Sequence, residues 1–402
     1  MNVRRSAAVL AATAVIGTAT PAVAASPAPS PSVAIPDGLY GKADPAFDGV
    51  WRQSLALIAQ HRADVEPAAE AVDWLVGQQC ADGAFAAFRA DTGKACDAKT
   101  QVDTNSTAAA LQALAAVGGH DIEISKARTW LRSVQNKDGG WGYTPGGASD
   151  ANSTSVVIGA LNALGGYPAS HVSKYGKSPF DALLDLSLPC AQGGAFAYQP
   201  DKKGKLAANA DATAAAVVGA MGMGMLTAQA EDGTKGGCTD SANPEQAAAN
   251  GGGAYLARAV RKDGYLKSSL PGSEDQPDYG NTADAVVALA VQGGEKAAQK
   301  PLRWLEKNSA AWARQSGPAA YAQLIIAADV AGADPRDFGG ADLVEQLNAT
   351  GPAPKKAAAE EPAAKDGDDG SGNAVWWTVL AGLAAGAGVG ILLSGRRKRQ
   401  QP

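Results

Sequence analysis

The sequence is poor in the side chains that form metal centres. Its 402 residues include three His and four Cys, and no two Cys are spaced as CxxC. Structural zinc sites need closely spaced Cys and His ligands, so we expect no zinc site and predict no cofactor. The 35 Lys and Arg and the 40 Asp and Glu give a net charge of −5 and are mixed along the body of the chain. Without a basic patch, the sequence predicts no nucleic-acid partner.

The start of the chain has the pattern of a signal peptide. In residues 1–25, Arg4 and Arg5 precede a short apolar run that ends in small residues. Export would place the four Cys where disulfides persist. Of the three possible pairings, the simplest closes two local loops, Cys80 with Cys96 and Cys190 with Cys238.

The other end of the chain predicts a membrane anchor. Residues 374–394 are apolar and about long enough to cross a membrane as one helix, and the basic tail 395–402 follows. By the positive-inside rule the tail is cytoplasmic and the body is extracellular. Residues 351–373 are rich in Pro, Ala, Gly and charge, which predicts a disordered stalk. The folded body is then 37–350, in a single-pass protein of the cell membrane.

A short pattern returns along the body. The stretch "WLRSVQNKDGGW" (130–141) matches "WLVGQQCADGAF" (74–85), with Trp, Leu, Gln, Asp-Gly and an aromatic residue at a constant offset. Weaker copies lie at 184–198, at 255–266, where Tyr265 follows Asp-Gly, and at 303–308. Self-similarity of this kind predicts a repeat architecture.

A second motif alternates with the first. Each copy begins with Asp or Asn, has Thr four residues later and continues in small apolar residues, as in "DTNSTAAALQALAAVGG". The copies begin at Asp103, Asp150, Asn209 and Asp278. Asp or Asn caps the first turn of a helix, and Gly ends it. The motif therefore predicts helices with defined starts and stops.

The two kinds of helix differ in their apolar surface. The helices of the second motif are apolar nearly all round, whereas "SKARTWLRSVQNK" has one apolar stripe. We infer pairs of an inner and an outer helix, which must stack side by side to bury their apolar faces. With 48–61 as a first inner helix, there should be about six pairs. We expect Trp74 and Trp130 on outer helices and four residues on inner ones, Leu111, Val157, Val217 and Val287.

The repeat resembles that of the squalene cyclase and protein prenyltransferase group. Gln135, Asp138, Gly139 and Trp141 carry the pattern best. The resemblance implies an all-α fold, an α/α toroid over 37–350, in which the starts of the inner helices converge on one mouth. A ring of caps around a cavity is also a ring of hydrogen-bonding groups. The predicted ligand-binding residues are Asp103, Asn105, Thr107, Asp150, Asn152, Thr154, Asn209, Asp211 and Asp278.

Features of the enzymes in this group are missing from the body. A class II terpene cyclase would need an Asp-x-Asp-Asp motif, and its one match is "DGDD" (366–369) in the stalk. Aromatic side chains, which stabilise carbocations, make up 6% of the chain. The predicted disulfides leave no Cys for a prenyltransferase zinc site. We therefore expect a binding protein more than an enzyme.

The inner helices also resemble those of the cobalamin carriers intrinsic factor and transcobalamin, which begin with Asp-Thr or Asp-x-x-x-Thr. This resemblance implies cobalamin as the ligand. It also implies a separate β-domain protein or a membrane transporter as partner, because the carriers use a β domain that this chain lacks. The sequence thus predicts a membrane-anchored surface protein that captures a small molecule for uptake. The alternative is an extracytoplasmic enzyme, either of the terpene cyclase/prenyltransferase-like group or a carbohydrate-active one that uses paired carboxylates.

Overall fold

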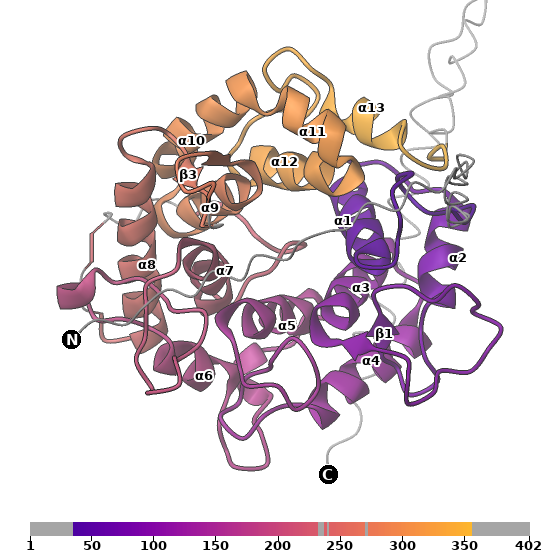
Figure 1. Cartoon of the computed structure of the whole chain (residues 1–402), viewed down its shortest axis with the longest axis horizontal. Helices are drawn as coiled ribbons and strands as arrows, with labels where there is room; N and C mark the ends of the chain where they lie inside the picture. Colours follow the sequence, from indigo (N-terminus) through magenta and orange to yellow (C-terminus); the bar gives the residue numbers. More distant parts are fainter. Residues whose placement is uncertain (1–34, 232–236, 239–240, 270–271, 356–402) are drawn as a thin grey trace, which may run out of the picture. The chain divides into compact units, whose positions relative to one another are not determined.

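The protein is a mostly helical α/α toroid, as the sequence predicts (Figure 1). The computed structural model describes residues 35–231, 237–238, 241–269 and 272–355. The predicted signal peptide, most of the predicted stalk and the predicted membrane span lie outside these residues. Within them, no helix has both the length and the apolar composition that a membrane crossing needs.

Six helices form the inner ring in the described part of the chain. Each packs on the next and the last packs on the first, so the ring is closed. The expected inner residues Leu111, Val157, Val217 and Val287 all lie on these helices and are buried. The inner helices are α1 (Gly49–Arg62), α3 (Thr104–Val117), α5 (Ala151–Ala163), α7 (Ala210–Ala220), α9 (Tyr279–Gly293) and α12 (Pro318–Val330).

An outer ring surrounds the inner one (Figure 1). Trp74 and Trp130 lie on its first two helices, as predicted. The short helix α11 (Ala310–Ser316) joins the outer helix α10 to the inner helix α12. The outer helices are α2 (Ala69–Gly77), α4 (Asp121–Ser133), α6 (Pro179–Asp185), α8 (Pro244–Val260), α10 (Glu295–Asn308) and α13 (Leu343–Asn348).

Two short antiparallel strand pairs occur where the turn after an outer helix meets the start of an inner helix. They are β1 (Phe85–Ala86) with β2 (Val102–Asp103), and β3 (Leu266–Lys267) with β4 (Pro277–Asp278). Two 3₁₀ turns, Pro168–Ser170 and Cys190–Gln192, lie in the connections between helices.

The Thr of the second motif joins the two motifs in each of four repeats. Its hydroxyl oxygen accepts a hydrogen bond from the backbone N–H of the turn that follows the outer helix. The bonds are Phe85 to Thr107 at 2.9 Å, Trp141 to Thr154 at 3.1 Å, Phe196 to Thr213 at 2.9 Å and Leu266 to Thr282 at 3.0 Å. All four Thr side chains are buried. The repeated Thr is therefore structural.

This bond corrects the alignment of one weak repeat. The sequence places Tyr265 at the aromatic position, but the residue that bonds Thr282 is Leu266. Leu266 is buried like Trp141, whereas the ring of Tyr265 contacts that of Trp304 on α10 at a tilt. The packing position needs a large apolar side chain, and Leu supplies it as well as an aromatic residue does.

The same turns hold neighbouring inner helices in register. Carbonyl oxygens of the turns accept hydrogen bonds from the first backbone N–H groups of the preceding inner helix. Ala87 accepts from Val50 of α1 at 2.8 Å, Tyr143 from Thr104 of α3 at 2.8 Å and Tyr198 from Ala151 of α5 at 3.1 Å. Each of these three turns therefore ties two inner helices together at their starts, which keeps the helices parallel and brings their starts to one mouth.

Both predicted disulfides are present. Cys80 bonds Cys96 and Cys190 bonds Cys238, with Cα–Cα separations of 5.6 and 5.5 Å. Each closes a loop beside one of the turns. Disulfides occur mostly in oxidising compartments; the extracellular location, the membrane anchor and a partner protein stay predictions.

We expect Thr154→Val to lower the free energy of unfolding by about 1 to 3 kcal/mol, because the buried N–H of Trp141 loses its acceptor. Denaturant unfolding measures the change. The control is Thr129→Val on the exposed face of α4, which should change stability by less than about 0.5 kcal/mol. Equal losses for the two variants would contradict a special role of the inner Thr.

Candidate ligand-binding cup

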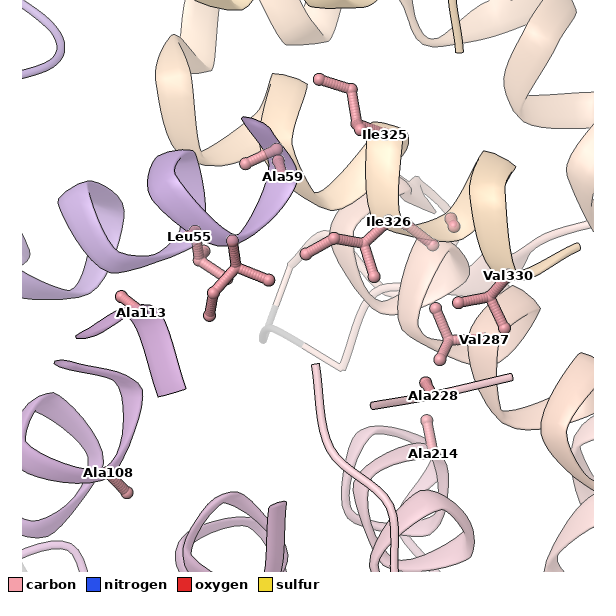
Figure 2. Packing of buried hydrophobic residues seen from close by; sticks show 14 of the residues in the cluster. Leu55, Ala59, Ala108, Ala113, Ala214, Ala228, Val287, Ile325, Ile326 and Val330 are labelled. Carbon is pink, nitrogen blue, oxygen red and sulfur yellow. The ribbon is translucent and has the colours of Figure 1, made fainter. Parts of the chain in front are cut away.

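A cavity of about 230 Å³ lies inside the inner ring. All six inner helices contribute side chains to its wall, and the segment 223–225 closes one end. Figure 2 shows Leu55 of α1, Val287 of α9 and Ile326 of α12, which come from different helices and face the middle of the ring. We refer to this cavity as the cup.

The cup is polar near the mouth and apolar below it. Asn105, Asn152 and Asp211 are each the second residue of an inner helix, α3, α5 and α7. One turn deeper, α9 and α12 contribute Asp284 and Gln323. The remaining wall is mostly aliphatic and includes Leu55, Val156, Val218, Val287 and Ile326.

The floor of the cup is formed by Met223, Gly224 and Met225, which follow α7. Arg62, the last residue of α1, holds this segment by donating to the carbonyl oxygens of Leu226 at 2.8 Å and Ala228 at 2.9 Å. The floor therefore closes the ring at the ends of the inner helices.

The same Arg62 also closes the ring itself. Its Nε donates to Asp329 near the end of α12 at 2.7 Å, which joins the first inner helix to the last. The floor of the cup and the seam of the ring thus share one guanidinium group.

The nine predicted ligand-binding residues divide into three groups. Four of them cap helices: their side chains accept from backbone N–H groups, Asp103 from Ser106, Asp150 from Ser153, Asn209 from Ala212 and Asp278 from Asn281, at 2.6 to 3.0 Å. Thr107 and Thr154 hold the turns. Neither group faces the cup. The three that line it are Asn105, Asn152 and Asp211.

Asn105 and Asn152 are not caps. The side-chain oxygen of each is buried and has no hydrogen-bond partner among the residues that the structure describes. A buried polar atom without a partner costs about 1 to 3 kcal/mol. These amides therefore contribute little to folding, and unfavourable polar groups of this kind are typical of functional sites.

Sequence reasoning missed Asp284, Gln323, Gln112 and Trp51. Asp284 interrupts the apolar run "TADAVVALAV", and a carboxylate on a helix that is apolar all round was a signal that could have found it. Gln323 lies on α12, which begins with Gly-Pro and lacks the Asp-x-x-x-Thr motif. Gly280 occupies the second position of α9 and has no side chain, so the polar ring continues at Asp284, one turn deeper.

The carboxylates of the cup have raised pKa values. Burial, together with the nearby charge of Asp211, raises the pKa of Asp284 to about 7, although Gln323 donates to its carboxylate at 3.3 Å. Burial also raises the pKa of Asp211, the hydrogen bond from Asn152 at 2.9 Å lowers it, and the charge of Asp278 raises it further. The cup thus holds a carboxyl group that is partly protonated at neutral pH.

The cup offers no positive charge. None of the side chains that line it in the described part of the chain is Lys, Arg or His. In the same residues no group of three or more His, Cys, Asp and Glu is arranged to hold a metal ion. An anionic ligand would meet only carboxylates and neutral groups in the cup.

Comparisons with known proteins agree with the repeat. The family described as Prenyltransferase alpha-alpha toroid domain matches residues 51–188. Drimenyl diphosphate synthase from Streptantibioticus cattleyicolor is 38% identical over 79 residues, which are 20% of this chain and 13% of that protein. The match thus spans a small part of the curated relative.

Two solved structures are similar to the toroid. Ent-copalyl diphosphate synthase from Streptomyces platensis has a TM-score of 0.47 and 17% identity, covering 71% of this chain and 50% of that one. A sugar epimerase from a ruminal bacterium has a TM-score of 0.47 and 13% identity, covering 74% of this chain and 93% of that one. By its architecture the protein is a mostly helical α/α toroid, and its residues 51–188 match the prenyltransferase toroid family.

The cobalamin interpretation gains no support from these matches. Cavities for drug-sized ligands measure about 300 to 1,000 Å³, and the cup is smaller, at about 230 Å³. The volume of the cup therefore favours a ligand smaller than a corrinoid.

Asp284→Asn should change how stability depends on pH. The folded protein holds the proton of Asp284 more tightly than the unfolded chain, with a pKa of about 7 against 3.8. The contribution of Asp284 to the free energy of unfolding is therefore present at low pH and is lost as pH rises from about 4 to about 7. We expect the variant to equal the wild type at pH 4 and to exceed it at pH 8 by at most about 4 kcal/mol.

Urea unfolding at pH 4, 6 and 8 measures this difference. Asp185→Asn on the exposed end of α6 is the matched control and should follow the wild type at every pH. A difference between Asp284→Asn and wild type that stays constant with pH would contradict the raised pKa.

Proposed function

We propose that the cup binds a small isoprenoid-like molecule, with a hydrocarbon body and one polar head group. The layering of the cup carries this proposal. The aliphatic walls at Leu55, Val218 and Ile326 would bury the hydrocarbon body, which contributes about 25 cal/mol per Å² of apolar area. The head group would meet the polar ring nearer the mouth.

The size of the cup limits the ligand. The volume of about 230 Å³ lies below the range of about 300 to 1,000 Å³ of cavities for drug-sized ligands. A ten-carbon isoprenoid is smaller than a drug-sized ligand and is therefore a suitable probe. Met223 and Met225 in the floor are flexible side chains that adapt to an irregular ligand.

The family match over residues 51–188 and the relative named drimenyl diphosphate synthase support the isoprenoid class. They do not supply the head group, because no Lys, Arg or His is among the described residues that line the cup and could bind a diphosphate.

Geraniol, a ten-carbon isoprenoid alcohol, should bind with a dissociation constant on the order of 1 to 100 µM. Isothermal titration of the purified full chain measures it. Ala215→Phe fills the cup from α7 and should weaken binding at least about tenfold. Ala207→Phe on an exposed loop is the control and should bind as the wild type does. Equal binding by both variants would place the ligand elsewhere.

A further inference from the structure

The polar ring of the cup has more hydrogen-bond acceptors than donors. An ionised carboxylate accepts at about four lone-pair positions. In the described structure Asp284 receives hydrogen bonds from one donor, Nε2 of Gln323, at 3.3 and 3.4 Å. Asp211 receives one from Asn152 at 2.9 Å. Two further acceptors, the side-chain oxygens of Asn105 and Asn152, are buried without a donor. The ring therefore lacks donors.

The ring also lacks positive charge. Asp211 and Asp284 line the cup, and Asp278 at the start of α9 adds to the negative field felt by both. Like charges in a buried site repel each other, and their ionised forms are stabilised when an opposite charge lies within about 4 to 6 Å. No cationic side chain in the described lining supplies that charge.

One aromatic ring lines the same cavity. Trp51 of α1 belongs to the wall near the mouth, opposite in the ring order to α7 with its Asp211. A cation that lies over the face of a Trp ring is attracted by the ring quadrupole. The wall thus combines two carboxylates with the aromatic side chain best suited to a cation.

We propose that the head group bound in the cup is a protonated amine that lies between Asp211 and Asp284, with the hydrocarbon body against the aliphatic wall. This inference rests on the proposed function and names its substrate class. An ammonium group carries three donors and one positive charge, so it supplies both the hydrogen-bond donors and the positive charge that the ring lacks. A hydroxyl group supplies one donor and no charge, and a diphosphate adds negative charge to a negative site.

Three ligands with the same hydrocarbon body test the inference: geranylamine, geraniol and geranyl diphosphate. Titration of the purified full chain at pH 7.5 measures their dissociation constants. We expect geranylamine to bind at least about tenfold more tightly than geraniol, because charge-assisted hydrogen bonds are roughly twice as strong as neutral ones. Geranyl diphosphate should bind more weakly than geraniol.

Charge-removing variants locate the effect. The double variant Asp211→Asn, Asp284→Asn keeps the shape of the ring and should reduce the advantage of geranylamine over geraniol to less than about threefold. The control removes two exposed carboxylates, Asp73→Asn and Asp185→Asn, and should keep the full advantage. A circular dichroism melt of both double variants verifies that they are folded.

The outcomes separate the two proposals. If geraniol binds as tightly as geranylamine, the amine inference is overturned while the proposed function stands. If the amine advantage persists in the cup double variant, the amine binds at another acidic surface and the inference is likewise overturned. If neither ligand binds, the proposed function fails and the inference with it.

Discussion

The hydrogen bond from the turn after an outer helix to a buried Thr of the next inner helix, which four repeats share, is the contact on which the toroid depends. It joins the two sequence motifs of one repeat, and the same turn accepts from the first N–H groups of the preceding inner helix, as Tyr143 does from Thr104. One turn thus fixes three helices. Repeated around the ring, this contact sets the inner helices parallel and brings their starts to one mouth, which no single helix pair could do.

The capping scheme also determines which side chains are free for function. In each motif the first residue caps the helix and the fifth holds the turn, so neither reaches the cavity. The third residue of the motif is left to face inward, and there the chain has Asn105, Asn152 and Asp211. The side-chain oxygens of the two Asn residues have no hydrogen-bond partner among the described residues, and the carboxylate of Asp211 is close enough to Asp278 and Asp284 for their charges to interact. The unpaired polar groups of this layer lower the stability of the fold, and the burial of aliphatic side chains below them raises it.

The floor shows how ring closure and site shape are linked. Arg62 joins α1 to Asp329 of α12, and the same guanidinium holds the segment that carries Met223 and Met225. A toroid needs a seam between its first and last inner helices, and here the seam also limits the depth of the cup. The Arg62 side chain is 10% exposed and bonds both partners, and charge-assisted bonds of this kind are costly to break.

The sequence by itself determined the repeat, the inner and outer helices, both disulfides and the presence of a polar ring at the helix starts. These features depend on local patterns, such as a cap followed by a Thr, which act within a few residues. Tertiary structure decided which polar residues face the cavity. Asp103 caps its helix and Asn105 faces the cavity because they lie two positions apart and so point to different sides of one helix. The roles of Asp284 and Gln323 depend on α9 and α12 packing side by side. Their chemistry follows from neighbours distant in the chain, whose charge and burial no local pattern records.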